Sequence, residues 1–215
     1  AWRRGQFDKN FKPSLKRRIF NWLVDFYEVR RFIKPHDYIT VLDIRTKDWV
    51  YEYFNKEAIV IRSGLDLEKF SYIARQPPKH KARIMVAGAL FVHRRFEDVI
   101  EAMKILKGKG FEIALYIIGD NSSNKEYQDY QMRLINFAKK LGIEKRVNFC
   151  GRVSDEELMR HYYSNDIYVS SNHLQSWGLA VFEAMSCGLP VVVSRSSGAS
   201  EVLADKETAI LVNPK

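Results

Sequence analysis

From residue 83 onward, short apolar runs alternate with longer segments in which apolar residues recur every three or four positions. The short runs have the composition of β-strands, and the longer segments have the period of amphipathic helices. The predicted strands are residues 83–87, 112–118, 147–150, 166–170, 191–194 and 209–212. The predicted helices are residues 96–107, 125–141, 154–164, 177–186 and 199–203. Because these strands are almost wholly apolar, the pattern predicts an α/β fold with a parallel sheet that helices cover on both faces.

The chain before residue 83 has a less regular pattern. It predicts a helix over residues 14–33, a strand over 37–42, a helix over 46–54 and a short strand over 58–61. The polar, proline-containing stretch at residues 76–81 has the composition of a linker. The sequence therefore indicates part of one α/β unit followed by a second, more regular one.

Polar loops follow the first five strands of the regular part. They cover residues 88–95, 119–121, 151–156, 171–178 and 194–199, and all five contain glycine. The carboxyl ends of parallel strands meet at one edge of a sheet, and ligands of such folds bind there. We therefore expect the ligand site among these loops.

The fourth of these loops has the most informative chemistry. Free backbone N–H groups of Ser176 to Leu179 open a predicted helix, and Gly178 lets a ligand approach, which suits a phosphate or a sugar hydroxyl. Glu183 lies in the second turn of that helix among apolar residues, where a carboxylate needs partners. The pattern leaves two interpretations open: a ligand-binding carboxylate, or an ordinary glutamate that is exposed or bonded to backbone.

Residues 175–192 resemble the Glu-x7-Glu signature of the retaining GT-B glycosyltransferases, specifically glycosyltransferase family 4, and its Met-x-x-Gly-x-Pro-Val-Val continuation. Three further segments are similar to this family in the same order. Residues 62–70 resemble its interdomain segment, residues 147–154 the loop beside the nucleobase, and residues 197–202 its Gly-Gly-x-x-Glu-Val segment. The similarity covers about residues 37–215, and several motifs in order are more specific than any one alone.

The resemblance implies a Rossmann-like, GT-B type organisation. Residues 1–70 correspond to the closing part of an N-terminal, acceptor-side domain and the interdomain segment. Residues 71–215 correspond to a C-terminal nucleotide-sugar-binding domain that is incomplete at its C-terminus. We therefore expect the chain to be mainly the donor-binding part of a longer enzyme and to be inactive alone.

The activity that the resemblance implies is transfer of a sugar from a nucleoside diphosphate sugar, such as a UDP- or GDP-sugar, to an acceptor with retention of anomeric configuration. Glu183 would accept hydrogen bonds from the ribose hydroxyls, and Arg94, followed by Arg95, would neutralise the donor diphosphate. The candidate catalytic residues are Arg94, Gln175 and Glu183. The candidate donor-binding residues are Gly88, Arg94, Arg95, Arg152, Val153, Gln175, Ser176, Trp177, Gly178, Leu179, Glu183 and Glu201, with Arg152 and Val153 facing the base.

Two positions depart from the family pattern. Gln175 stands where the first glutamate of the signature belongs, and its amide binds hydroxyls but carries no charge. Ala89 stands where the family has an arginine that partners the diphosphate-binding lysine. These departures put a binding module without transfer activity forward as the alternative function.

The expected reaction needs no metal or other cofactor. Fixed positive charge at the leaving phosphate does the work that a metal ion would do there. The sequence also contains no CxxC or HExxH spacing. A dehydrogenase is a poor alternative, because no strand is followed by Gly-x-Gly-x-x-Gly.

Charge is concentrated at the beginning of the chain. The 215 residues carry a net charge of +9, and residues 1–34 hold ten Lys and Arg against three Asp and Glu. Such an arm either attracts an anionic membrane surface or balances an acidic part of the intact protein. Glycan and lipid-linked acceptors are both compatible with the resemblance, and no nucleic-acid partner is expected, because aromatic and basic residues are not interleaved as in an RNA-binding sheet.

Composition narrows the class of protein. With 46% hydrophobic and 28% charged residues, the chain is typical of globular proteins rather than disordered ones. Two isolated cysteines, Cys150 and Cys187, form no disulfide framework and fit a reducing compartment. There is no apolar run of about 20 residues. We expect a cytoplasmic protein that associates peripherally with a membrane.

Overall fold

The computed structural model describes residues 15–28, 31, 35–36, 38–78, 81–119, 125–173 and 175–214. Most of the basic arm therefore lies outside the described residues, as does the loop at residues 120–124. The chain divides into two compact units, one ending at Ser63 and the other beginning at Gly64. The predicted division into residues 1–70 and 71–215 of a longer enzyme stays a prediction.

Among its described residues, the first unit has two α-helices and two short parallel strands. Its elements are α1 (Leu15–Glu28), β1 (Thr40–Val41), α2 (Ile44–Phe54) and β2 (Ile59–Val60). Asp43 caps α2, because its Oδ1 accepts the backbone N–H of Thr46 at 2.7 Å. Val41, Val50 and Ala58 form a small core. The predicted elements are thus present in this unit, with shorter strands than the sequence pattern indicated.

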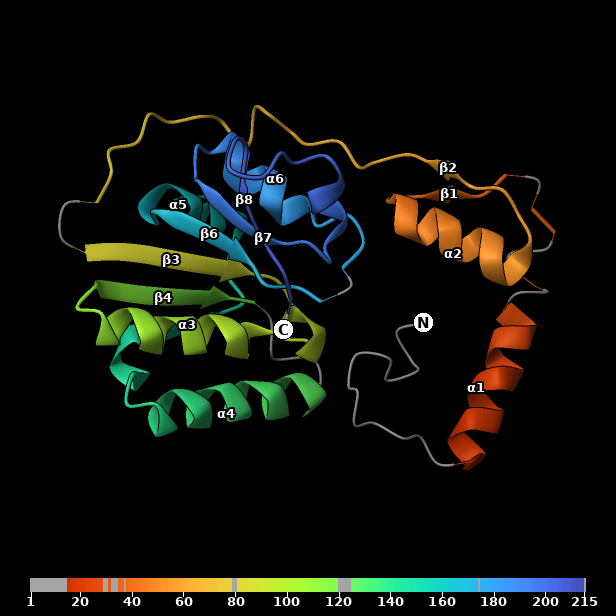
Figure 1. Cartoon of the computed structure of the whole chain (residues 1–215), viewed down its shortest axis with the longest axis horizontal. Helices are drawn as coiled ribbons and strands as arrows, with labels where there is room; N and C mark the ends of the chain where they lie inside the picture. The colour runs from red at the N-terminus through yellow and green to blue at the C-terminus, as the bar shows by residue number, and fades with distance from the viewer. Residues whose placement is uncertain are drawn as a thin grey trace. The chain divides into compact units, whose positions relative to one another are not determined.

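The second unit is built on a six-stranded parallel sheet (Figure 1). Its strands are β3 (Lys81–Ala87), β4 (Glu112–Ile118), β5 (Val147–Gly151), β6 (Ile167–Ser170), β7 (Val191–Ser194) and β8 (Ile210–Val212). The strands lie in the order β5-β4-β3-β6-β7-β8, and every neighbouring pair is parallel. This is the strand order of a Rossmann fold, in which the direction of winding reverses between the first and fourth strands, here β3 and β6.

Helices cover both faces of this sheet, so the predicted fold class is confirmed. The helices are α3 (Phe96–Gly108), α4 (Lys125–Lys140), α5 (Asp155–Ser164) and α6 (Leu179–Ser186), with short 3-10 turns η3 (Val92–Arg94), η4 (Glu144–Arg146) and η5 (Gly198–Glu201). Side chains of β3 alternate between two cores: Ile84 and Val86 pack with α3 and α4, whereas Met85 and Ala87 pack with α6 and Tyr162 of α5. Figure 1 shows α3 and α4 on one side of the sheet and α5 and α6 on the other.

Residues 64–78, here called the strap, are the first part of the second unit and pack on its helices before β3 begins. Lys69 Nζ lies 2.6 Å from Asp155 Oδ2, and Ser186 Oγ donates to the Phe70 carbonyl. The Phe70 ring is buried in the core that contains α5 and α6. The strap thus joins the two helices that cover one face of the sheet.

Candidate functional site

A cavity of about 400 Å³ lies at the carboxyl ends of β3, β4 and β5, beside the start of α6. This is the switch point of the sheet, where Rossmann-like folds bind ligands. The cavity is lined by Ala87, Gly88, Ala89, Arg94, Ile118, Gly119, Gly151, Arg152, Val153, Leu158, Tyr162, Gln175, Leu179, Ala180 and Glu183. Residues from four of the five polar loops of the sequence therefore meet around one space, whereas the loop at residues 194–199 is not among the lining residues.

Seven of the predicted site residues line this cavity. They are Gly88, Arg94, Arg152, Val153, Gln175, Leu179 and Glu183. Five others are not among the lining residues: Arg95, Ser176, Trp177, Gly178 and Glu201. Tyr162 lines the cavity although the sequence analysis did not select it, because no motif marks it.

Gly88 and Arg94 are shaped around each other. Gly88 has φ +139°, and a Cβ atom added to it would lie 2.7 Å from Arg94 Cζ and 3.0 Å from both terminal nitrogens. The Arg94 guanidinium therefore occupies the space that any larger residue would fill at position 88. The η3 turn, which ends at Arg94, folds the chain back so that this side chain returns to the end of β3.

The Arg94 guanidinium has few partners within the protein. Its Nη1 donates one long hydrogen bond of 3.4 Å to Asn172 Oδ1, and its Nε is buried without a hydrogen-bond partner. Burial lowers the pKa of Arg94 from its ordinary value. Within the described part of the chain, no carboxylate forms an ion pair with this residue. A partly buried cation in this state is poised for an anionic ligand, because burying an unpaired charge is costly.

Asn172 is a buried neighbour that the sequence analysis missed. Its Nδ2 donates to Ser170 Oγ at 2.9 Å, which orients Oδ1 toward Arg94. In addition, Ser171 Oγ donates to the Arg94 carbonyl at 2.7 Å. The end of β6 therefore holds both the backbone and the side chain of Arg94 in place.

The Arg95 side chain binds carboxylates of the protein itself. It adopts a left-handed conformation with φ 54°, and its Nε and Nη2 donate to the Asp98 carboxylate at 3.0 and 2.8 Å. Its Nη1 lies 3.2 Å from Glu97 Oε1. This guanidinium is therefore neutralised by the first turn of α3.

Glu183 projects from the second turn of α6 and lines the cavity. Its Oε2 accepts a hydrogen bond of 2.7 Å from Tyr162 Oη. Burial, together with Glu183 itself, raises the pKa of Tyr162 well above its ordinary value, so the phenol keeps its proton. The carboxylate is thus held by one donor and has acceptor capacity left for a ligand.

Helix α6 begins two residues later than the sequence pattern predicted. The helix begins at Leu179 rather than at residue 177, because Gly178 adopts a left-handed conformation with φ 77°. A Cβ at Gly178 would lie 3.2 Å from Ser197 Oγ and 3.5 Å from Gln175 Oε1. Trp177 is buried and its ring stacks on Phe182 at 4.4 Å, so it supports the helix from outside the cavity.

The β5 loop supplies the remaining wall. Gly151 accepts the Gly119 backbone N–H at 2.9 Å, which joins the ends of β4 and β5. Ser154 then caps α5 in a reciprocal capping box with Glu157. Arg152, which is exposed, and Val153 lie between these two fixed points and face the cavity. Glu201, at the end of η5, is exposed and stands outside this set.

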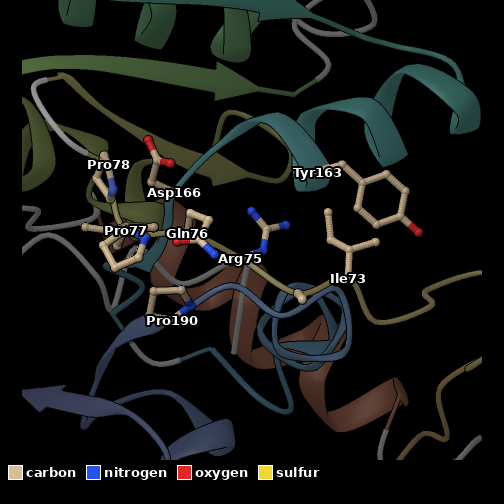
Figure 2. Close-up of a pocket in the computed structure, with 10 residues that line it drawn as sticks. Ile73, Arg75, Gln76, Pro77, Pro78, Tyr163, Asp166 and Pro190 are labelled. Atoms are coloured by element: carbon tan, nitrogen blue, oxygen red, sulfur yellow. The ribbon is translucent and has the colours of Figure 1, made fainter.

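A second cavity, of about 480 Å³, lies at the amino ends of β6 and β7 (Figure 2). It is lined by strap residues from Ile73 to Pro78 together with Tyr163, Asp166, Ile167 and Pro190. Its arginine, Arg75, donates to the carbonyl oxygens of Asn165 at 2.6 Å, Tyr162 at 2.5 Å and Cys187 at 3.0 and 3.1 Å. These carbonyls lie at the C-terminal ends of α5 and α6, so this cation caps two helices.

The described residues contain neither a metal-ligand cluster nor a membrane-spanning helix. Across the described ranges, no group of three or more His, Cys, Asp or Glu is placed to hold a metal ion. None of the described helices has the length and apolar character needed to span a bilayer.

Comparisons with known proteins identify the family of the chain. Residues 70–215 match the family described as "Glycosyl transferases group 1". Glycogen synthase from Mycobacterium tuberculosis is 26% identical over 186 residues, which cover 85% of this chain and 43% of that protein. The chain therefore spans less than half the length of this relative.

Solved structures share the fold. WaaG, a glycosyltransferase involved in lipopolysaccharide biosynthesis, superposes with a TM-score of 0.77 at 16% identity, covering 94% of this chain and 56% of WaaG. Anabaena Alr3699/HepE in complex with UDP-glucose superposes with a TM-score of 0.74 at 20% identity, covering 91% of this chain and 54% of that one.

Proposed function

Since the chain belongs to the glycosyl transferases group 1 family, we propose that it forms the donor-binding part of a retaining glycosyltransferase of family 4. The donor is a nucleoside diphosphate sugar, the group transferred is a hexose, and the nucleotide occupies the cavity at the switch point. Alr3699/HepE, which shares the fold, was solved with UDP-glucose. A binding module without transfer activity is not favoured, because the similar proteins carry synthase and glycosyltransferase names.

The observation that carries this proposal is the state of Arg94. A guanidinium that lines the cavity with a buried, unpartnered Nε and one 3.4 Å hydrogen bond has unused donor capacity for a diphosphate. Its charge stabilises the nucleoside diphosphate as it leaves the sugar, because negative charge develops on the leaving oxygen. Arg95 does not share this role, since Asp98 and Glu97 already neutralise it.

The other lining residues each contact a different part of the donor. Glu183 accepts hydrogen bonds from the ribose hydroxyls, and Arg152 and Val153 lie beside the base. The backbone at Leu179 opens α6 toward the phosphates. Gln175 binds hydroxyls of the transferred sugar. Its neutral amide does not stabilise positive charge at the anomeric carbon as the family glutamate would, so this stabilisation falls to the departing diphosphate held by Arg94, with the acceptor attacking from the same face.

A nucleotide-binding measurement tests the proposal. We expect a UDP-, GDP- or ADP-sugar to raise the melting temperature of the chain. Isothermal titration with the matching nucleoside diphosphate then gives the dissociation constant. Arg94→Ala should weaken diphosphate binding by about 10-fold to 150-fold, as expected for charge-assisted hydrogen bonds. Arg95→Ala is the matched control, because it removes the same charge one residue away and should change affinity little. Equal losses in the two variants, or equal losses for nucleoside and nucleoside diphosphate, would contradict the assignment.

We also propose that the intact enzyme works on the cytoplasmic side of a membrane, with a glycan or lipid-linked acceptor. The support is the charge of residues 1–34, since a basic residue near an anionic surface is worth about 1 kcal/mol. Sedimentation with liposomes should show binding to anionic vesicles and little to neutral ones. Equal binding to both would refute the membrane role without touching the donor site.

A further inference from the structure

We propose that Tyr162 is a positioning residue that fixes the Glu183 carboxylate for recognition of a ribose diol. This inference rests on the proposed function, because it concerns how the same donor cavity selects a ribonucleotide. Tyr162 lies in α5, outside the sequence motifs and outside the polar loops that follow the strands.

The link between the two side chains is a single hydrogen bond. Tyr162 Oη donates to Glu183 Oε2 at 2.7 Å, and the two residues come from different helices, α5 and α6. Tyr162 is 0% exposed, so water does not replace the phenol as donor. The hydroxyl therefore determines how the carboxylate is rotated about its last torsion.

Tyr162 is itself fixed by three neighbours. Its ring packs edge-on against Phe70 of the strap at 5.9 Å and lies 6.3 Å from the Tyr168 ring of β6. Its backbone carbonyl accepts a hydrogen bond from Arg75, which also binds the Cys187 carbonyl at the end of α6. The helix with the donor and the helix with the carboxylate are thus tied to one guanidinium, and the Tyr162–Glu183 distance is set by the framework.

This arrangement has a consequence for ligand recognition. A carboxylate has about four acceptor positions, and Tyr162 takes one of them on Oε2. The remaining positions are then presented in one orientation, which suits two adjacent hydroxyl donors. Without the phenol, Glu183 would sample several rotations, and the ligand would have to order it on binding.

The experiment measures ribose preference rather than affinity alone. Dissociation constants of UDP, GDP, ADP and their 2′-deoxy counterparts are measured by titration calorimetry for the wild type, Tyr162→Phe and Glu183→Gln. For the nucleotide that binds, we expect Tyr162→Phe to reduce the ratio of ribo to 2′-deoxy affinity by about fivefold to tenfold, as for loss of one hydrogen bond's worth of positioning. Affinity for the 2′-deoxy nucleotide should stay within about twofold.

Tyr130→Phe is the matched control. Tyr130 is also a buried tyrosine, 3% exposed, whose hydroxyl donates to a glutamate, Glu97. It lies in the opposite core, between α3 and α4, and does not line the cavity. This variant should lower the melting temperature and leave the ribose preference unchanged.

A double-mutant cycle separates the possible results. If Tyr162 acts through Glu183, Tyr162→Phe should change the ribose preference no further in the Glu183→Gln background. If Glu183→Gln abolishes the preference while Tyr162→Phe keeps it, the positioning role is overturned and the donor site stands. If the wild type binds none of the three nucleoside diphosphates, the proposed function itself fails. Should Tyr162→Phe be too unstable to measure at room temperature, the titrations are repeated in the cold for all variants, and a wild-type ribose preference in Tyr162→Phe there overturns the inference.

Discussion

Two arginines mark two cavities of similar size at opposite ends of the same sheet, and they are in opposite states. Arg75 donates four hydrogen bonds to carbonyl oxygens of Tyr162, Asn165 and Cys187. Arg94 makes one long hydrogen bond and keeps a buried Nε without a partner. Both guanidinium groups have a pKa lowered by burial. Burial alone therefore does not distinguish the two arginines, whereas the count of satisfied donors does.

The positions of the two residues explain this difference. Arg75 meets the C-terminal ends of α5 and α6, where unpaired carbonyl oxygens and the negative end of the helix dipole receive a cation. Arg94 lies at the carboxyl ends of the strands and lines the same cavity as Leu179, the first residue of α6. The positive end of the helix dipole disfavours a cation there unless an anion is bound. A cation beside a helix N-terminus favours an external anion, which supports our proposal that the cavity at Arg94 is the binding site, whereas the strap forms the cavity at Arg75.

The largest expected effect is on folding stability at Arg75. Arg75→Met should lower the free energy of unfolding by about 3 kcal/mol, because each hydrogen bond from a charged group is worth about 1.5–3 kcal/mol and these bonds share three acceptors. Arg94→Met should leave stability unchanged or raise it slightly, because an under-partnered cation is removed. Urea unfolding of both variants without ligand checks the contrast. A larger loss for Arg94→Met would reverse our assignment of the two residues.

Substitution of Gly88 should damage the site through geometry. A methyl group there would lie 2.7 Å from Arg94 Cζ, and the φ of +139° disfavours any side chain. Gly88→Ala should therefore displace the guanidinium and cost about 2 kcal/mol of nucleoside diphosphate binding, near the loss in Arg94→Ala. Gly110→Ala is a suitable control, since its φ is +86° and nothing lies within 4 Å of its added Cβ. Calorimetry should show weakened binding in the first variant only.

The sequence predicted the sheet well because each strand is a short apolar run with turn residues at its end. The six strands from β3 to β8 fall where these runs lie, and the parallel order follows from the alternation with helices. The motif residues Arg94, Gln175 and Glu183 also meet at one cavity, since strand ends converge. These parts of the site depend on local pattern and topology, which a sequence displays.

The partners of those residues were not predictable in the same way. Tyr162 and Asn172 reach Glu183 and Arg94 only through tertiary packing, across 21 and 78 positions of the sequence. Arg75 lies in the segment just before the polar linker and carries no motif, yet it joins two helices. The pairing of Arg95 with Asp98 was open as well, because an arginine at a helix start serves equally as phosphate ligand or as partner of the first acidic turn.

His93, the neighbour of Arg94, makes the free energy of unfolding depend on pH, because its imidazole is buried. His93 is 5% exposed, and burial, with a smaller effect from Arg94, lowers its pKa to about 4. The unfolded chain binds a proton near pH 6.5, so the stability from neutral His93 is full above that pH and is lost as pH falls toward 4. The loss from this residue is about 2 kcal/mol at pH 5 relative to pH 8. In His93→Gln, unfolding followed between pH 8 and 5 should show a correspondingly flatter dependence, whereas an unchanged slope would contradict the burial of this histidine.

The smallest expected effect concerns Gln175, which lines the cavity and which we propose contacts the transferred sugar rather than the nucleotide. Its side chain lies beside Gly178, and its backbone carbonyl oxygen accepts the Gly198 backbone N–H at 3.0 Å. The residue is therefore held where η5 meets the start of α6. Because a neutral amide contributes about 0.5–1.5 kcal/mol per hydrogen bond, Gln175→Ala should weaken the nucleotide sugar by that amount and leave the nucleoside diphosphate unchanged. Ser176→Ala, one residue away and outside the cavity lining, should change neither affinity. Paired titrations of the free diphosphate and its sugar conjugate give the difference directly. If Gln175→Ala weakens both ligands equally, residue 175 supports the helix start instead of contacting the sugar, and the cavity beside Arg94 would then recognise the nucleotide alone.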